Sequence, residues 1–389
     1  MRYQLVLPAL LVIAGQSAVA QMESTVNVGE RVTLRSELLD EDRALLIRVP
    51  ESYHESTFRY PVLYLLDARF NFLHTVGIVE FLAGTDQIPE VIVVGVINTN
   101  RSRDLTPPSN DEDETAFWDE VGGAGRFAQF FETELFPFIE GHYRTAPYRI
   151  IRGQSFGGLF AVLDLMSATP MFNAYLTSSP AVGWNFKELV DRAPDFVDAG
   201  FTPFLYVSAA GRDFPGNLGS IQMYVAALEA GGRIDRRWHY EFFEDEGHYS
   251  LMLRSTYNGL TRLYRGWQVP DSVASLARFV DYEEHYAGLS ERYGYEIRIP
   301  MGSIIRLGNR LLQQQRYSDG IAVKERLLDL YPDQPESFWH VGDAYLLSGQ
   351  PEMALPYLEM AYEKAVEIEA ADVERYRLSV EEIEAQLVR

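Results

Sequence analysis

The sequence contains no cysteine among its 389 residues. This absence excludes disulfide bridges, thiolate nucleophiles and thiolate metal ligands together. Histidine is also scarce, at seven residues, and no pair of histidines has ligand spacing with a carboxylate nearby. The sequence therefore disfavours a metal-dependent enzyme.

Basic residues are few, with 34 lysines and arginines against 56 aspartates and glutamates, and the formal net charge is −22. Such a charge repels nucleic acid and anionic lipid, so we expect neither as a partner. The hydrophobic fraction of 47% is that of an ordinary globular protein. The length favours one large domain with a smaller one, or two equal domains.

Long apolar runs are also missing, apart from Leu5 to Ala14 near the start. This run follows Arg2 and precedes the small residues Ala18-Val19-Ala20, which is typical of a signal peptide. It is shorter than the roughly 20 residues that span a bilayer. We therefore predict a signal peptide over residues 1–20, a mature chain that begins near Gln21, and a periplasmic or secreted location without a membrane span.

Residues 21–270 have the pattern of an α/β domain. Apolar and polar residues alternate from Glu30 to Pro50 around a charged turn, which predicts an antiparallel hairpin. Short apolar runs then predict buried strands at Pro61–Leu66, Val91–Ile97, Tyr148–Ile151, Phe204–Ala209 and Trp238–Phe243. Amphipathic stretches between them predict helices, including Phe127–Tyr143, Gly158–Ala168 and Ile221–Ala230. This alternation predicts a mainly parallel sheet with helices on both faces.

After Gln268 the periodicity is helical throughout, and a repeat of 34 residues is present. The matched pairs are Gly308 with Gly342, Leu311 with Tyr345, Gly320 with Ala354, Lys324 with Leu358 and Leu327 with Ala361. Residues 301–368 thus resemble two tetratricopeptide repeats. We expect a helical connector over 271–300 and a small all-α domain over 301–389 with a capping helix from Ala370 to Val388. Two repeats are too few to stand alone, so we expect them to pack against the catalytic domain or Asp281–Gly294.

The segment from Gly153 to Gly157 reads Gly-Gln-Ser-Phe-Gly, between an apolar strand and an apolar helix. This context favours a nucleophile elbow, in which Ser155 lies on a sharp turn that needs small neighbours. The backbone amide of Phe156 would then stabilise an oxyanion. A second amide is expected from the loop after the strand Pro61–Leu66, where Ala68 and Arg69 are the candidates.

A serine nucleophile needs a base that follows it in the chain. His248 comes directly after a predicted strand, whereas His239 lies inside that strand and His285 and His340 lie in the helical region. We therefore predict that His248 is the general base.

The acid of the triad is expected after the preceding strand, where it would orient the imidazole. Asp213 fits this position best. Glu244, Asp245 and Glu246 compete because they adjoin His248, and a dyad without an acid also remains open.

These motifs together resemble the putative-esterase family of α/β-hydrolases, which includes the enterochelin and bacillibactin trilactone esterases and is related to esterase D. The resemblance rests on Leu65-Leu66-Asp67, Asn100 to Pro107, Gly153 to Gly158, Ser178-Ser179-Pro180 with Trp184, and Gly247-His248. It implies hydrolysis of small carboxylic esters by Ser155 and His248 without any cofactor. It also implies that Arg103, Asp104 and Trp184 lie near the cleft, with Arg103 and Trp184 as substrate-binding candidates. Some members carry a tetratricopeptide tail.

Two other functions remain open at this stage. An acyltransferase would use the same acyl-enzyme but deliver the acyl group to an alcohol instead of water. A scaffold would instead bind a protein partner through the repeat region, with an inert hydrolase domain. The motifs identify the reaction, whereas the substrate, of siderophore type or another small ester, is not specified.

Overall fold

The computed structural model describes residues 27–54, 56–118, 120–199, 203–230, 238–270, 278–370 and 372–388. The predicted signal peptide lies outside these residues. Within them, no helix is both long and apolar enough to cross a membrane.

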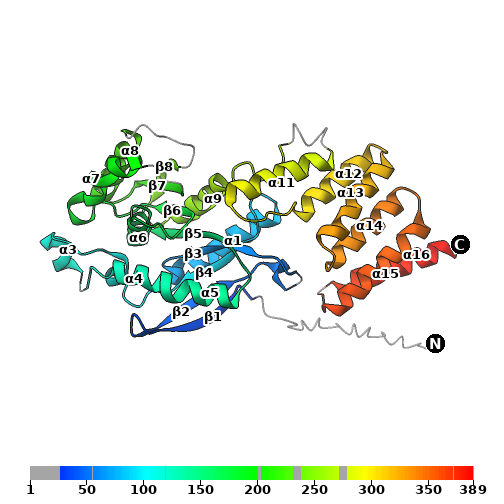
Figure 1. Ribbon diagram of the computed structural model, residues 1–389, viewed down its shortest axis with the longest axis horizontal. Coiled ribbons are helices and arrows are strands. Elements are labelled where there is room, and N and C mark those ends of the chain that lie inside the picture. Colours follow the sequence, from blue (N-terminus) through cyan, green and yellow to red (C-terminus); the bar gives the residue numbers. More distant parts are fainter. Residues whose placement is uncertain are drawn as a thin grey trace, which may run out of the picture.

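The described strands form one eight-stranded sheet in the order β1-β2-β4-β3-β5-β6-β7-β8 (Figure 1). The hairpin of β1 and β2 pairs antiparallel with β4, and the remaining neighbours are parallel. The strands are β1 (Glu30–Ser36), β2 (Glu41–Arg48), β3 (Tyr60–Leu65), β4 (Ile92–Val96), β5 (Thr145–Gln154), β6 (Ala174–Ser178), β7 (Phe204–Arg212) and β8 (Trp238–Gly247). Strand β6 was not predicted, because its five residues are a mixture of apolar and hydroxyl side chains.

Helices cover both faces of this sheet, as expected for mainly parallel strands. The helices of the α/β part are α1 (Ala68–Gly84), α2 (Arg101–Leu105), α3 (Glu112–Phe117), α4 (Ala124–Phe130), α5 (Phe136–His142), α6 (Phe156–Leu165), α7 (Trp184–Ala199), α8 (Pro215–Ala230) and α9 (Leu251–Leu263). A π-helical turn joins α4 to α5, so the predicted helix Phe127–Tyr143 is nearly continuous.

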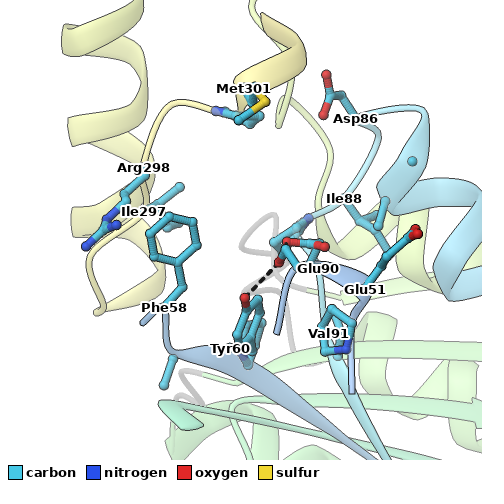
Figure 2. Close-up of a pocket in the computed structure, with 18 of the residues that line it drawn as sticks. Glu51, Phe58, Tyr60, Asp86, Ile88, Glu90, Val91, Ile297, Arg298 and Met301 are labelled. Carbon is cyan, nitrogen blue, oxygen red and sulfur yellow. Dashed lines mark hydrogen bonds between the residues drawn. The ribbon is translucent and has the colours of Figure 1, made fainter. Parts of the chain in front are cut away.

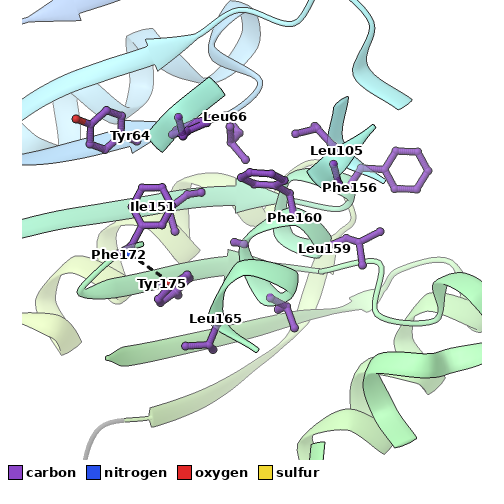
Figure 3. Close-up of a cluster of buried hydrophobic side chains, with 14 of the residues drawn as sticks. Tyr64, Leu66, Leu105, Ile151, Phe156, Leu159, Phe160, Leu165, Phe172 and Tyr175 are labelled. Carbon is purple, nitrogen blue, oxygen red and sulfur yellow. Dashed lines mark hydrogen bonds between the residues drawn. The ribbon is translucent and has the colours of Figure 1, made fainter. Parts of the chain in front are cut away.

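The two faces bury separate hydrophobic clusters, because successive side chains of a strand point to opposite sides. Tyr64 of β3 packs into the first cluster with α4, α5, α6, α7 and α8. Figure 3 shows Tyr64 with Phe160 of α6 and other members of this cluster. Leu63 and Leu65 of the same strand pack into the second cluster with α1 and α9. The strands are apolar on both sides for this reason, which is why continuous apolar runs identified most of them.

The C-terminal helices are α11 (Phe279–Tyr293), α12 (Met301–Gln313), α13 (Tyr317–Leu330), α14 (Pro335–Leu347), α15 (Pro351–Glu367) and α16 (Val373–Leu387). Apolar residues of α11, α12 and α13 belong to the second cluster, so this part shares a core with the sheet.

The 34-residue repeat corresponds to repeated contacts. A Cβ atom added at Gly308 would lie 2.7 Å from the Lys324 side chain, and one at Gly342 would lie 2.8 Å from Leu358. Each glycine thus allows its helix to approach the next helix closely, and the two contacts are equivalent. The assignment of these helices to the tetratricopeptide family stays a prediction.

Candidate active site

Ser155 lies on a sharp turn between the end of β5 and the start of α6. Its backbone has φ 54° and ψ −116°, a conformation that is strained for a residue with a Cβ atom. A Cβ atom at Gly153 would collide with the backbone of Gly157, and one at Gly158 would lie 2.9 Å from Pro180. These glycines are therefore required by the close approach of strand, turn and helix, and the serine is displayed at the carboxyl end of the parallel strands.

His248 follows β8 and lies at this same end of the sheet. Its Nδ1 atom is 2.8 Å from Oδ1 of Asp213, a residue that follows β7. The Asp213 side chain is fully enclosed, and the imidazole is 8% exposed. Of the carboxylates considered from the sequence, Asp213 is the one in contact with this ring. Glu246 instead bonds Ser250 and Arg254.

The surroundings of Asp213 favour its charged form. Burial alone would raise the pKa of the carboxyl, but hydrogen bonds, first of all with His248, hold it below its ordinary value. The backbone amide of Phe214 donates to Oδ1 at 2.7 Å, and the Asn217 side chain donates to Oδ2 at 3.1 Å. An ionised Asp213 accepts a hydrogen bond from Nδ1–H of His248. In the neutral ring Nε2 is then unprotonated and able to accept a proton.

A hydrogen bond connects the histidine loop to the serine turn. The buried side chain of Gln154, which directly precedes Ser155, donates from Nε2 to the backbone carbonyl of His248. Two segments 94 positions apart in the sequence are thereby joined beside the serine. Sequence reasoning missed this role, because nothing in the pattern Gly-Gln-Ser indicates what the glutamine binds.

The loop between β3 and α1 packs against the serine turn. A Cβ atom at Gly157 would lie 3.3 Å from Leu66 and 3.4 Å from the Asp67 carboxylate. The next residue, Ala68, is buried and begins α1, and Phe156 begins α6. Amides in the first turn of a helix have no acceptor within that helix, so both remain oxyanion candidates. Arg69 lies one position further on and is exposed.

Arg101 is a site residue that the sequence analysis did not select. Its guanidinium binds both carboxylate oxygens of Asp67, at 2.7 and 2.9 Å, and donates to the carbonyl of Gln154 at 3.2 Å. It also lies over the Phe156 ring, 5.3 Å from the centroid. Arg101 thus bonds the loop before α1 and the strand before Ser155 together. The segment Asn100 to Pro107 was recognised in the sequence, but its pattern does not indicate which of its arginines binds the strand before Ser155.

Arg103 and Trp184 are held by other protein groups. The Arg103 guanidinium is 2.7 Å from Asp104 and 2.9 Å from Glu41. The Trp184 side chain is 5% exposed and donates to the carbonyl of Pro107 at 3.1 Å. Its ring meets the Phe156 ring edge to face, with centroids 5.3 Å apart. Contact of either residue with substrate stays a prediction.

Exposed aromatic rings lie beside Phe156 and beside His248. Trp118 meets Phe156 edge to face with centroids 5.0 Å apart, and its neighbour Phe117 is 76% exposed. On the other side, Phe214 lies 4.9 Å from the His248 ring and is 56% exposed. These rings offer apolar, flat surfaces next to the nucleophile. No group of three or more metal-ligating side chains occurs among the described residues.

Comparison with known proteins finds similarity to esterases. Residues 36–198 match the family model described as "Putative esterase". An IroE-like serine hydrolase of Shewanella oneidensis has a similar structure, with a TM-score of 0.65 and 28% identity, over 78% of this chain and 99% of that one. Over residues 36–198 the chain is thus similar to the putative esterase family.

Among curated relatives, ferri-bacillibactin esterase BesA of Bacillus subtilis is 34% identical over 154 residues, covering 36% of this chain and 53% of the relative. The apo-salmochelin esterase of Escherichia coli is 31% identical over 151 residues, covering 34% and 45%. The chain thus spans about half the length of the curated relatives that it matches.

Proposed function

We propose that this chain is a serine hydrolase of carboxylic esters. The observation that carries the proposal is the hydrogen-bonded pair of His248 and Asp213, tethered through Gln154 to the strained turn of Ser155. A serine at a strand-to-helix turn, an imidazole with a free Nε2 and an enclosed carboxylate are the three groups that acyl transfer requires. The similarity of residues 36–198 to the putative esterase family supports the same reaction.

In the proposed reaction His248 Nε2 removes the Ser155 hydroxyl proton while Oγ attacks the ester carbonyl. The negative charge on the carbonyl oxygen is stabilised by the amides of Phe156 and Ala68 or Arg69. His248 then returns the proton to the leaving alcohol, and an acyl-enzyme remains on Ser155. Water, deprotonated by the same imidazole, attacks the acyl-enzyme and releases the carboxylic acid and the free serine.

We propose siderophore-type esters with aromatic acyl groups as the substrate class. Two curated relatives, of Emericella nidulans and Aspergillus fumigatus, are named as siderophore esterases, which supports this choice. Phe117, Trp118 and Phe214 supply the exposed rings on which an aromatic acyl group would pack. Export to the periplasm or the medium is also a proposal, which rests on the pattern of residues 1–20 alone.

A fluorophosphonate probe tests the nucleophile directly. We expect labelling of the full chain, loss of labelling in Ser155→Ala, and unchanged labelling in Ser167→Ala, which removes an exposed hydroxyl outside the site. Hydrolysis of a catechol-type trilactone should exceed hydrolysis of a short alkyl ester. Labelling that persists in Ser155→Ala would refute the proposal, and a folded chain that is never labelled would favour the scaffold.

Analysis of the reaction products distinguishes an acyltransferase from a hydrolase. In the presence of acceptor alcohols, a hydrolase releases mostly free acid, whereas a transferase forms mostly the new ester.

A further inference from the structure

A large cavity lies at the opposite end of the sheet from Ser155. Its volume is about 780 Å³, and it is bounded by residues at the amino ends of β3, β4 and β5 and by the start of α12. Figure 2 shows Phe58, Glu90 and Met301 around this open space. Because Ser155 follows the carboxyl end of the ten-residue strand β5, the two sites are about 30 Å apart along that strand. The cavity is therefore separate from the catalytic site.

The cavity has the size and the chemistry of a small-molecule site. Volumes of about 300–1,000 Å³ with mainly apolar walls and a few polar groups are typical of such sites. Here the apolar walls come from both parts of the chain, with Ile88 and Val91 on the sheet side and Ile297 and Met301 on the helical side. A ligand in this space would contact the α/β part and the C-terminal helices together.

The charge available inside the cavity is negative. Glu90 is half-buried, and its carboxylate accepts a hydrogen bond from Ser52 Oγ at 2.6 Å, which is the one partner that the described residues give it. Burial raises the pKa of the Glu90 carboxyl, and the nearby carboxylates Glu51 and Asp86 raise it further, while the bond from Ser52 lowers it. A positive charge placed beside Glu90 would relieve the repulsion from these neighbours.

The arginines of the lining already have partners. Arg48 binds Glu80 at 2.6 Å, and Arg306 binds Asp86 at 2.6 Å. Arg298 lies over the Phe58 ring, 4.1 Å from its centroid, and the exposed Arg59 donates to a backbone carbonyl at 3.3 Å. These cations therefore leave Glu90 without a counter-charge.

We propose that the cavity binds a small organic cation that carries a primary ammonium group and an apolar or aromatic body. The ammonium group would bind Glu90, and the body would pack between the apolar walls. Such a ligand would stabilise the contact between the sheet and the C-terminal helices, because both contribute to its site.

Calorimetric titration of the full chain at pH 8 with three matched probes tests this proposal. Tyramine has the ammonium and the ring, phenethylamine keeps both without the phenol hydroxyl, and 3-(4-hydroxyphenyl)propionate replaces the ammonium with a carboxylate. We expect both amines to bind and the carboxylate not to bind. Equal binding of the anion and the amine, or no binding of either amine, would overturn the proposal.

Variants place the binding in the cavity. Glu90→Gln keeps the size of the side chain and an acceptor for Ser52 but removes the charge, and should weaken tyramine binding about tenfold or more. Glu296→Gln is the control, because Glu296 is 82% exposed at the rim, and should change binding less than about twofold. If Glu90→Gln does not fold, Met301→Trp supplies the second test, because it fills the cavity from α12 and should abolish binding. Unchanged tyramine binding in folded Glu90→Gln, or in folded Met301→Trp, would contradict the proposal.

Discussion

The side-chain amide of Gln154 donates a hydrogen bond to the backbone carbonyl of His248, so the residue before the nucleophile fixes the loop that carries the base. Gln154 is buried, and the interaction therefore has no competing solvent. The position of the imidazole depends on the serine turn itself as well as on Asp213. Two independent bonds, one to the backbone and one to the ring, orient His248.

We predict that Gln154→Met reduces kcat about tenfold to a hundredfold with little change in KM. Methionine preserves the volume but leaves the His248 carbonyl without its donor, which costs about 1–3 kcal/mol and loosens the loop. Steady-state kinetics with an aryl ester measure the effect. We also expect slower fluorophosphonate labelling of Gln154→Asn, because the shorter amide does not reach the His248 carbonyl. Wild-type kcat in a folded Gln154→Met would show that the tether has no role.

Arg101→Met should lower kcat/KM about tenfold to a hundredfold. The variant loses the two bonds to Asp67 and the bond to the Gln154 carbonyl, so the loop with the second oxyanion amide is no longer fixed against the serine turn. Because Arg101 acts by positioning, Arg101→Lys should recover only part of the rate, since lysine cannot bind both carboxylate oxygens in the same way.

Arg103→Met is the matched control, because it removes an arginine two positions away whose partners are Asp104 and Glu41. We expect this variant to lower the thermal midpoint of unfolding and to leave kcat nearly unchanged. A raised KM in the Arg103 variant together with a normal rate in the Arg101 variant would contradict this expectation. It would indicate that Arg103 binds the substrate.

The sequence predicts most strands and the three triad positions, but it does not predict the contacts that hold the site together. The apolar runs of β3, β4, β5 and β7 were recognisable because both faces of these strands are buried, whereas β6 has only five residues with hydroxyl groups among them. The prediction that Trp238–Phe243 is a buried strand was wrong, because β8 is an edge strand and most of its residues are half-buried or exposed. Ser155, His248 and Asp213 follow from position relative to strands, which is local information. The partners of Gln154 and Arg101 depend on tertiary contacts across 94 and 34 positions, and the cavity depends on how two parts of the chain pack, so no local pattern indicates them.

We predict that the buried carboxyl of Asp164 makes the folded chain less stable as the pH rises. Burial raises the pKa of its carboxyl from an ordinary 3.8 to about 6, although hydrogen bonds from Tyr175 and the Met171 amide oppose this shift. A raised pKa means that the folded state prefers the protonated acid. Its contribution to stability is therefore complete below about pH 4 and is lost as the pH rises through about 6.

The measurement is the free energy of unfolding by urea between pH 4.5 and pH 8. A shift of about two pKa units corresponds to about 3 kcal/mol, an upper value for the loss in the wild-type chain. Asp164→Asn keeps an acceptor oxygen for Tyr175 and the Met171 amide but does not ionise, so its curve should be flatter and lie above wild type at pH 8. Asp191→Asn, which changes an exposed aspartate, should follow the wild-type curve. Parallel curves for wild type and Asp164→Asn would contradict the assignment.

Two helical glycines in the C-terminal part should respond to substitution in opposite directions. A Cβ atom at Gly288, in the middle of α11, has no atom within 4 Å, whereas one at Gly342 lies 2.8 Å from the Leu358 side chain. Gly288→Ala should therefore stabilise the protein by about 0.5–1 kcal/mol, because alanine loses less backbone entropy in a helix. Gly342→Val should destabilise it by about 1–3 kcal/mol, because α14 and α15 are forced apart. Thermal and urea unfolding measure both changes. Gly342→Val with wild-type stability would mean that α14 and α15 do not pack through this glycine, and the structural equivalence of the Gly308 and Gly342 contacts would then fail.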